Sequence, residues 1–189
     1  MAAGGDPDRI VLGSGGPAAA VALPARDRGG PRALGRMLMR SMLDDWNDTP
    51  SAHQMAGLGV FDRTSSETGW SALLGAPRSC GGRLALRRAR SRGRPVRSSP
   101  PAFIDVGSAE TFRDEDVTCA SRVWQAGGSA EPHVWPGGFH GFDSPVPEAA
   151  LSVDARAARI RCCAGCWASE PPPRPGRAIG EERRWFGAA

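Results

Sequence analysis

Short apolar runs and helix-like patterns alternate along most of the chain, and turn-forming residues separate them. The sequence DPDRIVL (Asp6–Leu12) ends in a short apolar run, and the turn sequence GSGGP and an Ala-rich stretch (Ala18–Ala25) follow it. This order predicts a strand, a glycine turn and a helix. The run RMLMRSML (Arg36–Leu43) predicts a second strand, which the polar cluster DDWNDTPS closes.

The clearest strand is predicted over AFIDVGSAE (Ala102–Glu110), because two prolines precede its apolar run and a Gly-Ser turn follows it. HVWPGGFHGF (His133–Phe142) predicts a strand that runs into a glycine-rich loop. The apolar positions of three further segments predict helices: one or two in Ala52–Leu74, one in Phe112–Ala126 and one in Pro147–Arg159.

The segment FRDEDVTCASRVWQA (Phe112–Ala126) has acids in its first turn, where the helix dipole favours them. Helical spacing gathers four residues near one face, which we expect to be buried: Phe112, Val117, Ala120 and Trp124. Because predicted strands alternate with predicted helices, the sequence indicates an α/β fold with a mainly parallel sheet.

A length of 189 residues corresponds to one domain. The longest uncharged stretch, Ile10–Ala25, has 16 residues and contains glycines and prolines, so it is a poor membrane span. The residues before it, MAAGGDPDR, are too acidic for a signal peptide. We therefore expect a soluble, cytoplasmic protein.

The basic residues are unevenly distributed, and all 24 of them are arginines. Eight lie between Arg78 and Arg97, whereas no acid occurs between Glu67 and Asp105. Such a block can bind phosphate backbones without sequence preference, but it has no interleaved aromatic residues on which bases would stack. We therefore expect no specific nucleic-acid partner.

Three candidate catalytic side chains follow predicted strands: Ser14, Glu110 and His140. Parallel sheets gather their sites at the carboxyl ends of strands, so the three can converge. A serine, an acid and a histidine in this chain order are typical of α/β-hydrolases, in which the histidine takes the serine proton and the acid fixes the histidine tautomer. Taken singly, each has an ordinary structural interpretation as a turn serine, a first-turn acid or an exposed loop histidine.

The sequences AFIDVGSAETFRDEDV and AEPHVWPGGFHGFD resemble the acid-bearing and histidine-bearing segments of the hormone-sensitive-lipase type of α/β-hydrolase, the bacterial esterases and lipases. The resemblance implies a partial α/β-hydrolase domain over residues 1–161, namely the C-terminal half of the sheet with flanking helices. It implies a serine esterase or lipase with Ser14 as nucleophile, His140 as general base, Glu110 as orienting acid and Gly15 in the oxyanion hole. The expected substrate is a small ester or an acylglycerol.

Two features depart from that family. The nucleophile motif G-x-S-x-G reads Leu12-Gly13-Ser14-Gly15-Gly16 here, so a leucine replaces the first glycine of a tightly wound turn. The HGG-type oxyanion loop that relatives carry well upstream of the nucleophile has no counterpart in the sequence. An inactive remnant of such an enzyme is therefore an alternative to an active esterase, and a basic nucleic-acid-binding protein is a third.

Two segments give amino-acid sequences similar to those of this family when their codons are reread in another frame. With suitable codons, GRLALRRARSR (Gly82–Arg92) becomes DVSPYAAPAR, and CCAGCWA (Cys162–Ala168) becomes LRRLLG. We therefore interpret about Ala76–Ser99 and residues 162–189 as out-of-frame translation, and we expect Ala76–Ser99 and Ala164–Ala189 to be irregular.

Metals and cofactors are not expected. Structural zinc needs four ligands, and no histidine lies at zinc-finger spacing from the cluster of Cys162, Cys163 and Cys166. The sequence VLGSGGP lacks the Lys-Ser/Thr of a phosphate loop and the spacing of a dinucleotide fingerprint.

Overall fold

The computed structural model describes most of the first half of the chain and a long continuous segment of the second: Asp6, residues 9–16, Val21, Arg28, and residues 30–31, 33–74 and 100–168. The predicted helix Ala18–Ala25, apart from Val21, lies outside the described residues. So do the Arg-rich segment Ala76–Ser99 and the tail beyond Ala168.

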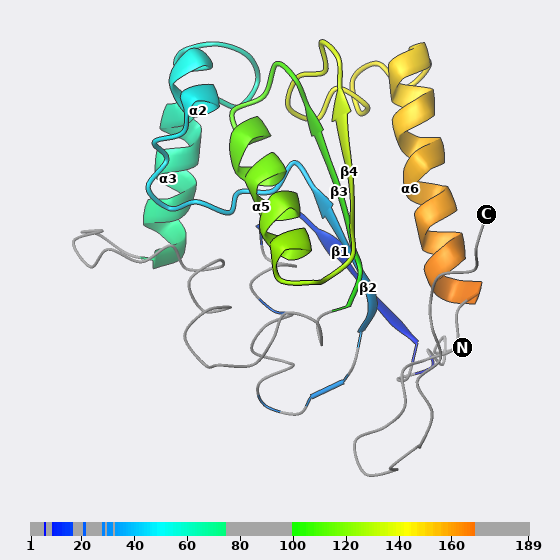
Figure 1. Ribbon diagram of the computed structural model, residues 1–189. Coiled ribbons are helices and arrows are strands. Elements are labelled where there is room, and N and C mark those ends of the chain that lie inside the picture. The colour runs from blue at the N-terminus through cyan, green and yellow to red at the C-terminus, as the bar shows by residue number, and fades with distance from the viewer. Residues whose placement is uncertain are drawn as a thin grey trace, which may run out of the picture.

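Four parallel strands form one sheet in the order β1-β2-β3-β4: β1 (Ile10–Ser14), β2 (Ala33–Met39), β3 (Ala102–Gly107) and β4 (Ala130–Trp135). In the register, Ser14 lies beside Leu38, and Leu38 lies beside Ile104. All strands point the same way, so their carboxyl ends share one edge of the sheet, at the top of Figure 1. Parallel α/β sheets place their sites at this edge.

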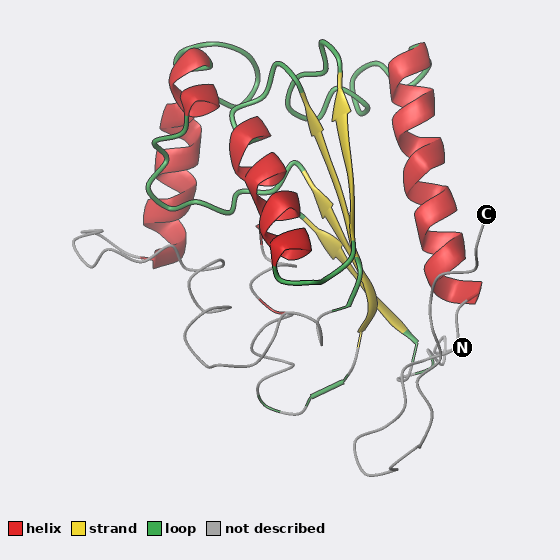
Figure 2. Ribbon diagram, in the orientation of Figure 1, coloured by secondary structure: helices red, strands yellow, loops and turns green. Residues whose placement is uncertain are grey.

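Helices cover both faces of the sheet. Helices α2 (Pro50–Gln54), α3 (Arg63–Leu74) and α5 (Arg113–Gln125) lie on one side, and α6 (Ala150–Ala168) lies on the other (Figures 1 and 2). The predicted α/β class is therefore confirmed, and the one or two helices expected in Ala52–Leu74 are two, α2, which begins slightly earlier at Pro50, and α3.

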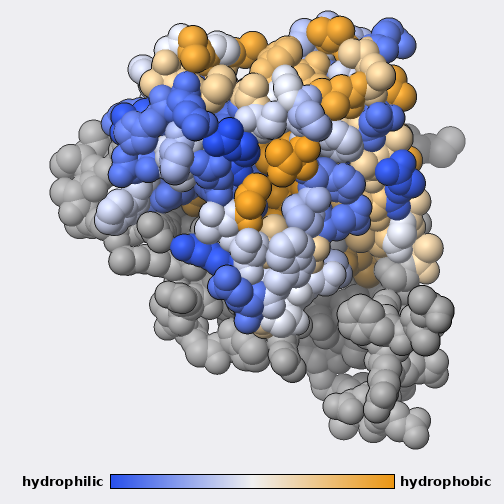
Figure 3. All heavy atoms as spheres, turned by 45° about the horizontal axis from the view of Figure 1, so that its top comes forward, coloured by the Kyte–Doolittle hydropathy of each residue, from blue (hydrophilic) through white to orange (hydrophobic). Residues whose placement is uncertain are grey.

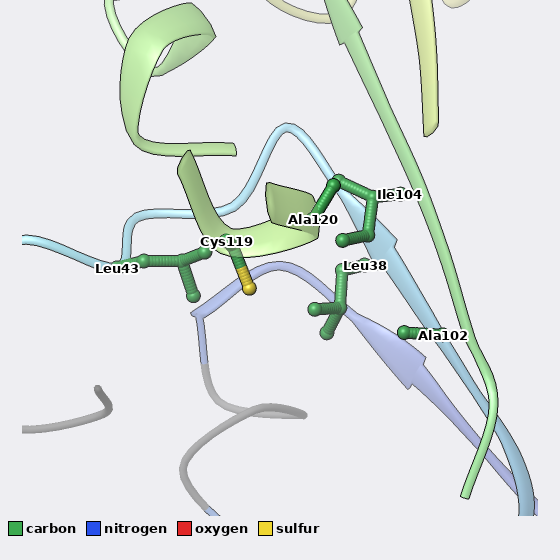
Figure 4. Packing of buried hydrophobic residues seen from close by; sticks show 6 residues of the cluster. All are labelled: Leu38, Leu43, Ala102, Ile104, Cys119 and Ala120. Carbon is green, nitrogen blue, oxygen red and sulfur yellow. The ribbon is translucent and has the colours of Figure 1, made fainter. Parts of the chain in front are cut away.

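The alternation of side chains along β2 and β3 builds a separate apolar core on each face. On the α5 side, the buried cluster consists of Leu38, Leu43, Ala102, Ile104, Cys119 and Ala120 (Figure 4). On the α6 side, Met37 and Phe103 pack with Ala158. Burial of both faces explains why the strands read as nearly continuous apolar runs.

Strand β2 ends at Met39, four residues earlier than the run Arg36–Leu43 predicts. Arg40 has a left-handed backbone, with φ of 42°, which cannot continue a strand. The backbone N–H groups of Ser41 and Leu43 donate to buried carboxylates of α5 instead of to a neighbouring strand.

The predicted buried face of α5 is wrong in part. Val117 and Trp124 are 41% and 49% exposed, although Phe112 and Ala120 are buried as expected. The buried face instead carries two acids, Glu115 and Asp116, beside apolar residues. Backbone N–H groups from the segment after β2 donate to one oxygen of each carboxylate, which lowers the cost of their burial.

Helix α6 continues nine residues beyond Arg159, so the expectation that the chain is irregular from Ala164 is wrong for Ala164–Ala168. Cys162 packs against the cluster around Met37 on the sheet. This packing against the sheet stabilises the helix beyond Arg159, where the predicted amphipathic pattern ends.

Candidate active site

Glu110 and His140 reach each other from loops that follow neighbouring strands. Glu110 lies between β3 and α5, and His140 lies in the loop between β4 and α6. His140 Nδ1 is 3.0 Å from Glu110 Oε1. The Glu110 side chain is fully buried and the His140 side chain is 22% exposed. This arrangement offers a buried acid to an imidazole that still reaches solvent.

Each of the three histidines of the chain lies within hydrogen-bond distance of a carboxylate: His53 of Asp48 at 2.7 Å, His133 of Glu131 at 2.8 Å, and His140 of Glu110 at 3.0 Å. Burial distinguishes the last pair, because the side chains of Asp48 and Glu131 are 64% and 60% exposed. Water screens such exposed pairs, so they contribute little to the stability of the fold. The His140 pair also joins residues 30 positions apart, so its formation requires the fold.

Backbone hydrogen bonds join the two loops that carry this pair. Ser108 N–H donates to the Trp135 carbonyl at 2.8 Å, and Ala109 N–H donates to the Gly138 carbonyl at 2.9 Å. In return, Gly137 N–H donates to the Ser108 hydroxyl at 2.8 Å. These bonds fix the chain just before the acid to the chain just before the histidine.

The close approach of the two loops requires a glycine at the end of β3. A Cβ added at Gly107 would lie 2.0 Å from the Gly138 carbonyl oxygen, which is a backbone atom and cannot turn away. We expect Gly107→Ala to lower the free energy of unfolding by about 1–3 kcal/mol through overpacking. Urea unfolding measures this change.

Gly13→Ala is the matched control, because a Cβ at Gly13 on β1 has no neighbour within 4 Å. It is expected to change the unfolding midpoint little. Equal effects of the two substitutions would contradict the argument from the close approach.

Two aromatic rings hold the His140 imidazole. The Phe61 ring stacks on it at 4.7 Å between centroids, and the Phe112 ring meets it edge-on at 5.7 Å. The Thr111 hydroxyl donates to the Phe61 carbonyl at 2.9 Å and so ties the α2–α3 loop to the residue after Glu110. Sequence reasoning missed Phe61, because no local pattern connects this loop to the histidine.

Ser14 is the last residue of β1 and therefore lies at the same edge of the sheet as the loops that bear Glu110 and His140. Its side chain is outside the described part of the structure. A Cβ at Gly16 would lie 2.3 Å from the Met42 carbonyl oxygen, so this turn needs a glycine. Leu12, which replaces the first glycine of the expected motif, packs against the core cluster around Leu38. A Cβ added at Gly15 would lie 3.4 Å from the Met39 carbonyl oxygen.

Within the described residues, no three His, Cys, Asp or Glu side chains are grouped to hold a metal ion. Burial and the neighbouring Cys166 raise the pKa of Cys162 to about 12. None of the helices in this part of the chain is both long and apolar enough to cross a membrane.

Comparisons with known proteins agree with this geometry. Residues 2–144 match a family model described as the alpha/beta hydrolase fold. No curated protein matches the sequence.

Several solved structures are similar. A bacterial heroin esterase is 30% identical with a TM-score of 0.75, over 87% of this chain and 53% of that one. The esterase LipW from Mycobacterium marinum is 29% identical with a TM-score of 0.73, over 85% of this chain and 50% of that one. An esterase of the bacterial hormone-sensitive lipase family, 20% identical with a TM-score of 0.71 over 86% of this chain and 55% of that one, shares the fold. The chain thus spans about half the length of these enzymes, and by its family match it belongs to the alpha/beta hydrolase fold family.

Proposed function

We propose that the chain is a carboxylic ester hydrolase that works through an acyl-enzyme on Ser14. The observation that carries the proposal is the hydrogen bond between the buried Glu110 carboxyl group and His140 Nδ1. An ionised carboxylate only accepts hydrogen bonds, so Nδ1 carries the ring proton and Nε2 is left as the base.

In the proposed reaction, the Ser14 hydroxyl oxygen attacks the ester carbonyl carbon while His140 Nε2 takes the hydroxyl proton. The Gly15 N–H group contributes to stabilising the negative charge on the carbonyl oxygen. When the intermediate collapses, the C–O bond to the alcohol breaks and His140 returns its proton to the leaving oxygen. Water then repeats the sequence on the acyl-enzyme and releases the acid. Each step uses side chains and backbone groups alone, so the proposal includes no cofactor or metal.

The proposed substrate is a small ester or an acylglycerol. Leu58 and Val60, in the loop that brings Phe61 to the histidine, are 56% and 72% exposed. Val146, in the loop after His140, is 49% exposed. Apolar residues are visible on this side of the molecule when its top is turned forward (Figure 3). Exposed apolar residues in the loops that carry the base and the ring stacked on it favour an acyl group over a charged substrate.

Hydrolysis of p-nitrophenyl butyrate by the full chain tests the proposal, with Ser14→Ala as the comparison. We expect turnover in the wild type and its loss in the variant. Turnover that survives the substitution would remove Ser14 from the mechanism. A complete absence of turnover would favour the alternative, a remnant of an esterase without activity.

We also propose that residues 1–161 form a partial α/β-hydrolase domain, in which about Ala76–Ser99 is read out of frame, and that residues 162–189 are an out-of-frame tail after it. The nucleotide sequence of the gene tests this proposal. The codons for Gly82–Arg92 must then encode an amino-acid sequence similar to SPYAAPAR in another reading frame. The cytoplasmic location stays a prediction.

A further inference from the structure

Asp143 follows His140 by three residues, and both oxygens of its carboxylate are bound. Arg40 Nη1 donates to Asp143 Oδ1 at 3.2 Å, and Arg159 Nη1 donates to Asp143 Oδ2. The Asp143 side chain is 9% exposed. Burial alone would raise the pKa of Asp143, but the two guanidinium groups outweigh burial and hold this pKa below its ordinary value. Asp143 is therefore a charged anchor inside the histidine loop.

Arg159 extends the anchor to the sheet. Its Nε and Nη2 atoms each lie 2.7 Å from Asp105 Oδ2 on β3, while Trp135 Nε1 donates to the same oxygen at 3.3 Å. The resulting four-residue network of two arginines and two aspartates consists of Arg40, Asp105, Asp143 and Arg159. It joins the end of β2, the middle of β3, the histidine loop and α6, so the loop is held directly from the end of β2 and from α6, and Arg159 of α6 is held in turn by β3.

The backbone of Arg40 is strained at the point where the network meets the site. Its φ of 42° is uncommon for a residue with a side chain. The Arg40 side chain passes Gly141, the residue after His140, where an added Cβ would lie 3.9 Å from Arg40 Nε. Strain of this kind persists where surrounding contacts fix the residue, and here the contact is to the histidine loop.

The network also borders the acid. Arg40, Asp105 and Arg159 line a small cavity whose wall includes Glu110 and the histidine-loop residue Phe142. A movement of the loop away from the network would therefore change the position of His140 relative to Glu110.

We propose that Asp143, clamped between Arg40 and Arg159, is a positioning residue that fixes the loop so that the His140 imidazole stays bonded to Glu110. The expected effect of Asp143 on the reaction rate rests on the proposed ester hydrolysis. Its expected effect on the position of the His140 imidazole does not.

Nuclear magnetic resonance of the histidine rings in the full chain tests the geometric part. The chain has three histidines, so His53→Gln and His133→Gln assign the signals by elimination. The isosteric change Asp143→Asn removes the charge while it keeps the shape. We expect the Nδ1 proton signal of His140, shifted downfield by its bond to Glu110, to broaden or disappear in this variant because exchange with water is faster.

Hydrolysis of p-nitrophenyl butyrate tests the kinetic part. We expect Asp143→Asn to lower kcat about tenfold to a hundredfold with little change in KM, because a misplaced base slows the reaction more than binding. Arg40→Asn removes the same contact from the other side with a residue that tolerates the left-handed backbone, and a smaller loss in the same direction is expected.

Glu148→Gln is the control, because Glu148 is an exposed acid in the same loop. It should leave the His140 signal and kcat unchanged. If Asp143→Asn and Arg40→Asn lower the melting temperature but leave both the signal and kcat as in the wild type, the network is only structural and the proposal is wrong. If the wild type shows no turnover, the proposed function fails, and the imidazole signal alone decides the positioning role.

Discussion

Glu110→Gln is expected to lower kcat for ester hydrolysis about ten-thousandfold, the order of loss seen when the acid of a serine-protease triad becomes an amide. The amide keeps the size of the side chain, but its NH2 group can donate to His140 Nδ1. The ring would then carry its proton on Nε2, which is the nitrogen needed as a base. Because one carboxylate oxygen already lacks a partner among the described residues, the substitution leaves most of the local packing in place.

Glu131→Gln is a matched control for this result. Glu131 Oε1 also lies within 2.8 Å of a histidine ring nitrogen, but that pair is on the surface of β4. Both variants are assayed with p-nitrophenyl butyrate, and their unfolding midpoints are compared. We expect a large loss of kcat only for Glu110→Gln. Similar small effects of both substitutions would contradict a catalytic role for the buried pair.

The pairing of Glu110 with His140 could be predicted because it depends on topology. Both residues follow predicted strands, and a parallel sheet places the carboxyl ends of its strands along one edge. The buried strand β3 was clear from its continuous apolar run between two prolines and a Gly-Ser turn. A local pattern was thus enough to place both loops at the same edge of the sheet.

The buried polar contacts could not be predicted in this way. Hydrophobic periodicity assigned Val117 to the core, whereas the structure buries Glu115 and Asp116. Their partners are backbone N–H groups after β2, about 70 residues earlier in the chain. The Arg40–Asp143 contact similarly joins residues 103 positions apart. Periodicity counts apolar positions, so it carries no information about a polar group that finds its partner only in the folded chain.

Glu115 is a buried acid for which a large effect of pH on stability is expected. Its carboxylate Oε2 accepts from Leu43 N–H at 3.1 Å and from Asp44 N–H. Burial raises the pKa of Glu115 from 4.5 to about 9, because these two hydrogen bonds do not offset desolvation and the nearby Asp44 and Glu110 carboxylates add to the increase. Folding therefore favours the protonated form.

The sign of the pH effect follows from this difference. The folded state binds the proton more tightly than the unfolded state, so the Glu115 contribution to stability is complete below about pH 4.5 and is lost as the pH rises toward 9. One pKa unit corresponds to about 1.4 kcal/mol. Half of the rise in the pKa of Glu115 therefore corresponds to a loss of about 3 kcal/mol in the free energy of unfolding. We expect Glu115→Gln to remove this loss, because the amide oxygen still accepts both N–H bonds and carries no charge to desolvate.

The measurement is urea unfolding of the wild type and Glu115→Gln from pH 5 to pH 9, with the exposed Asp154 on α6 changed to asparagine as a control. The variant should be more stable than the wild type at pH 8.5 by up to about 3 kcal/mol, and the two should converge near pH 5. Asp154→Asn should follow the wild type throughout. Parallel curves for the wild type and Glu115→Gln would mean that the folded chain holds Glu115 ionised at pH 5. The two backbone donors from the segment after β2 would then outweigh the cost of burying the charge.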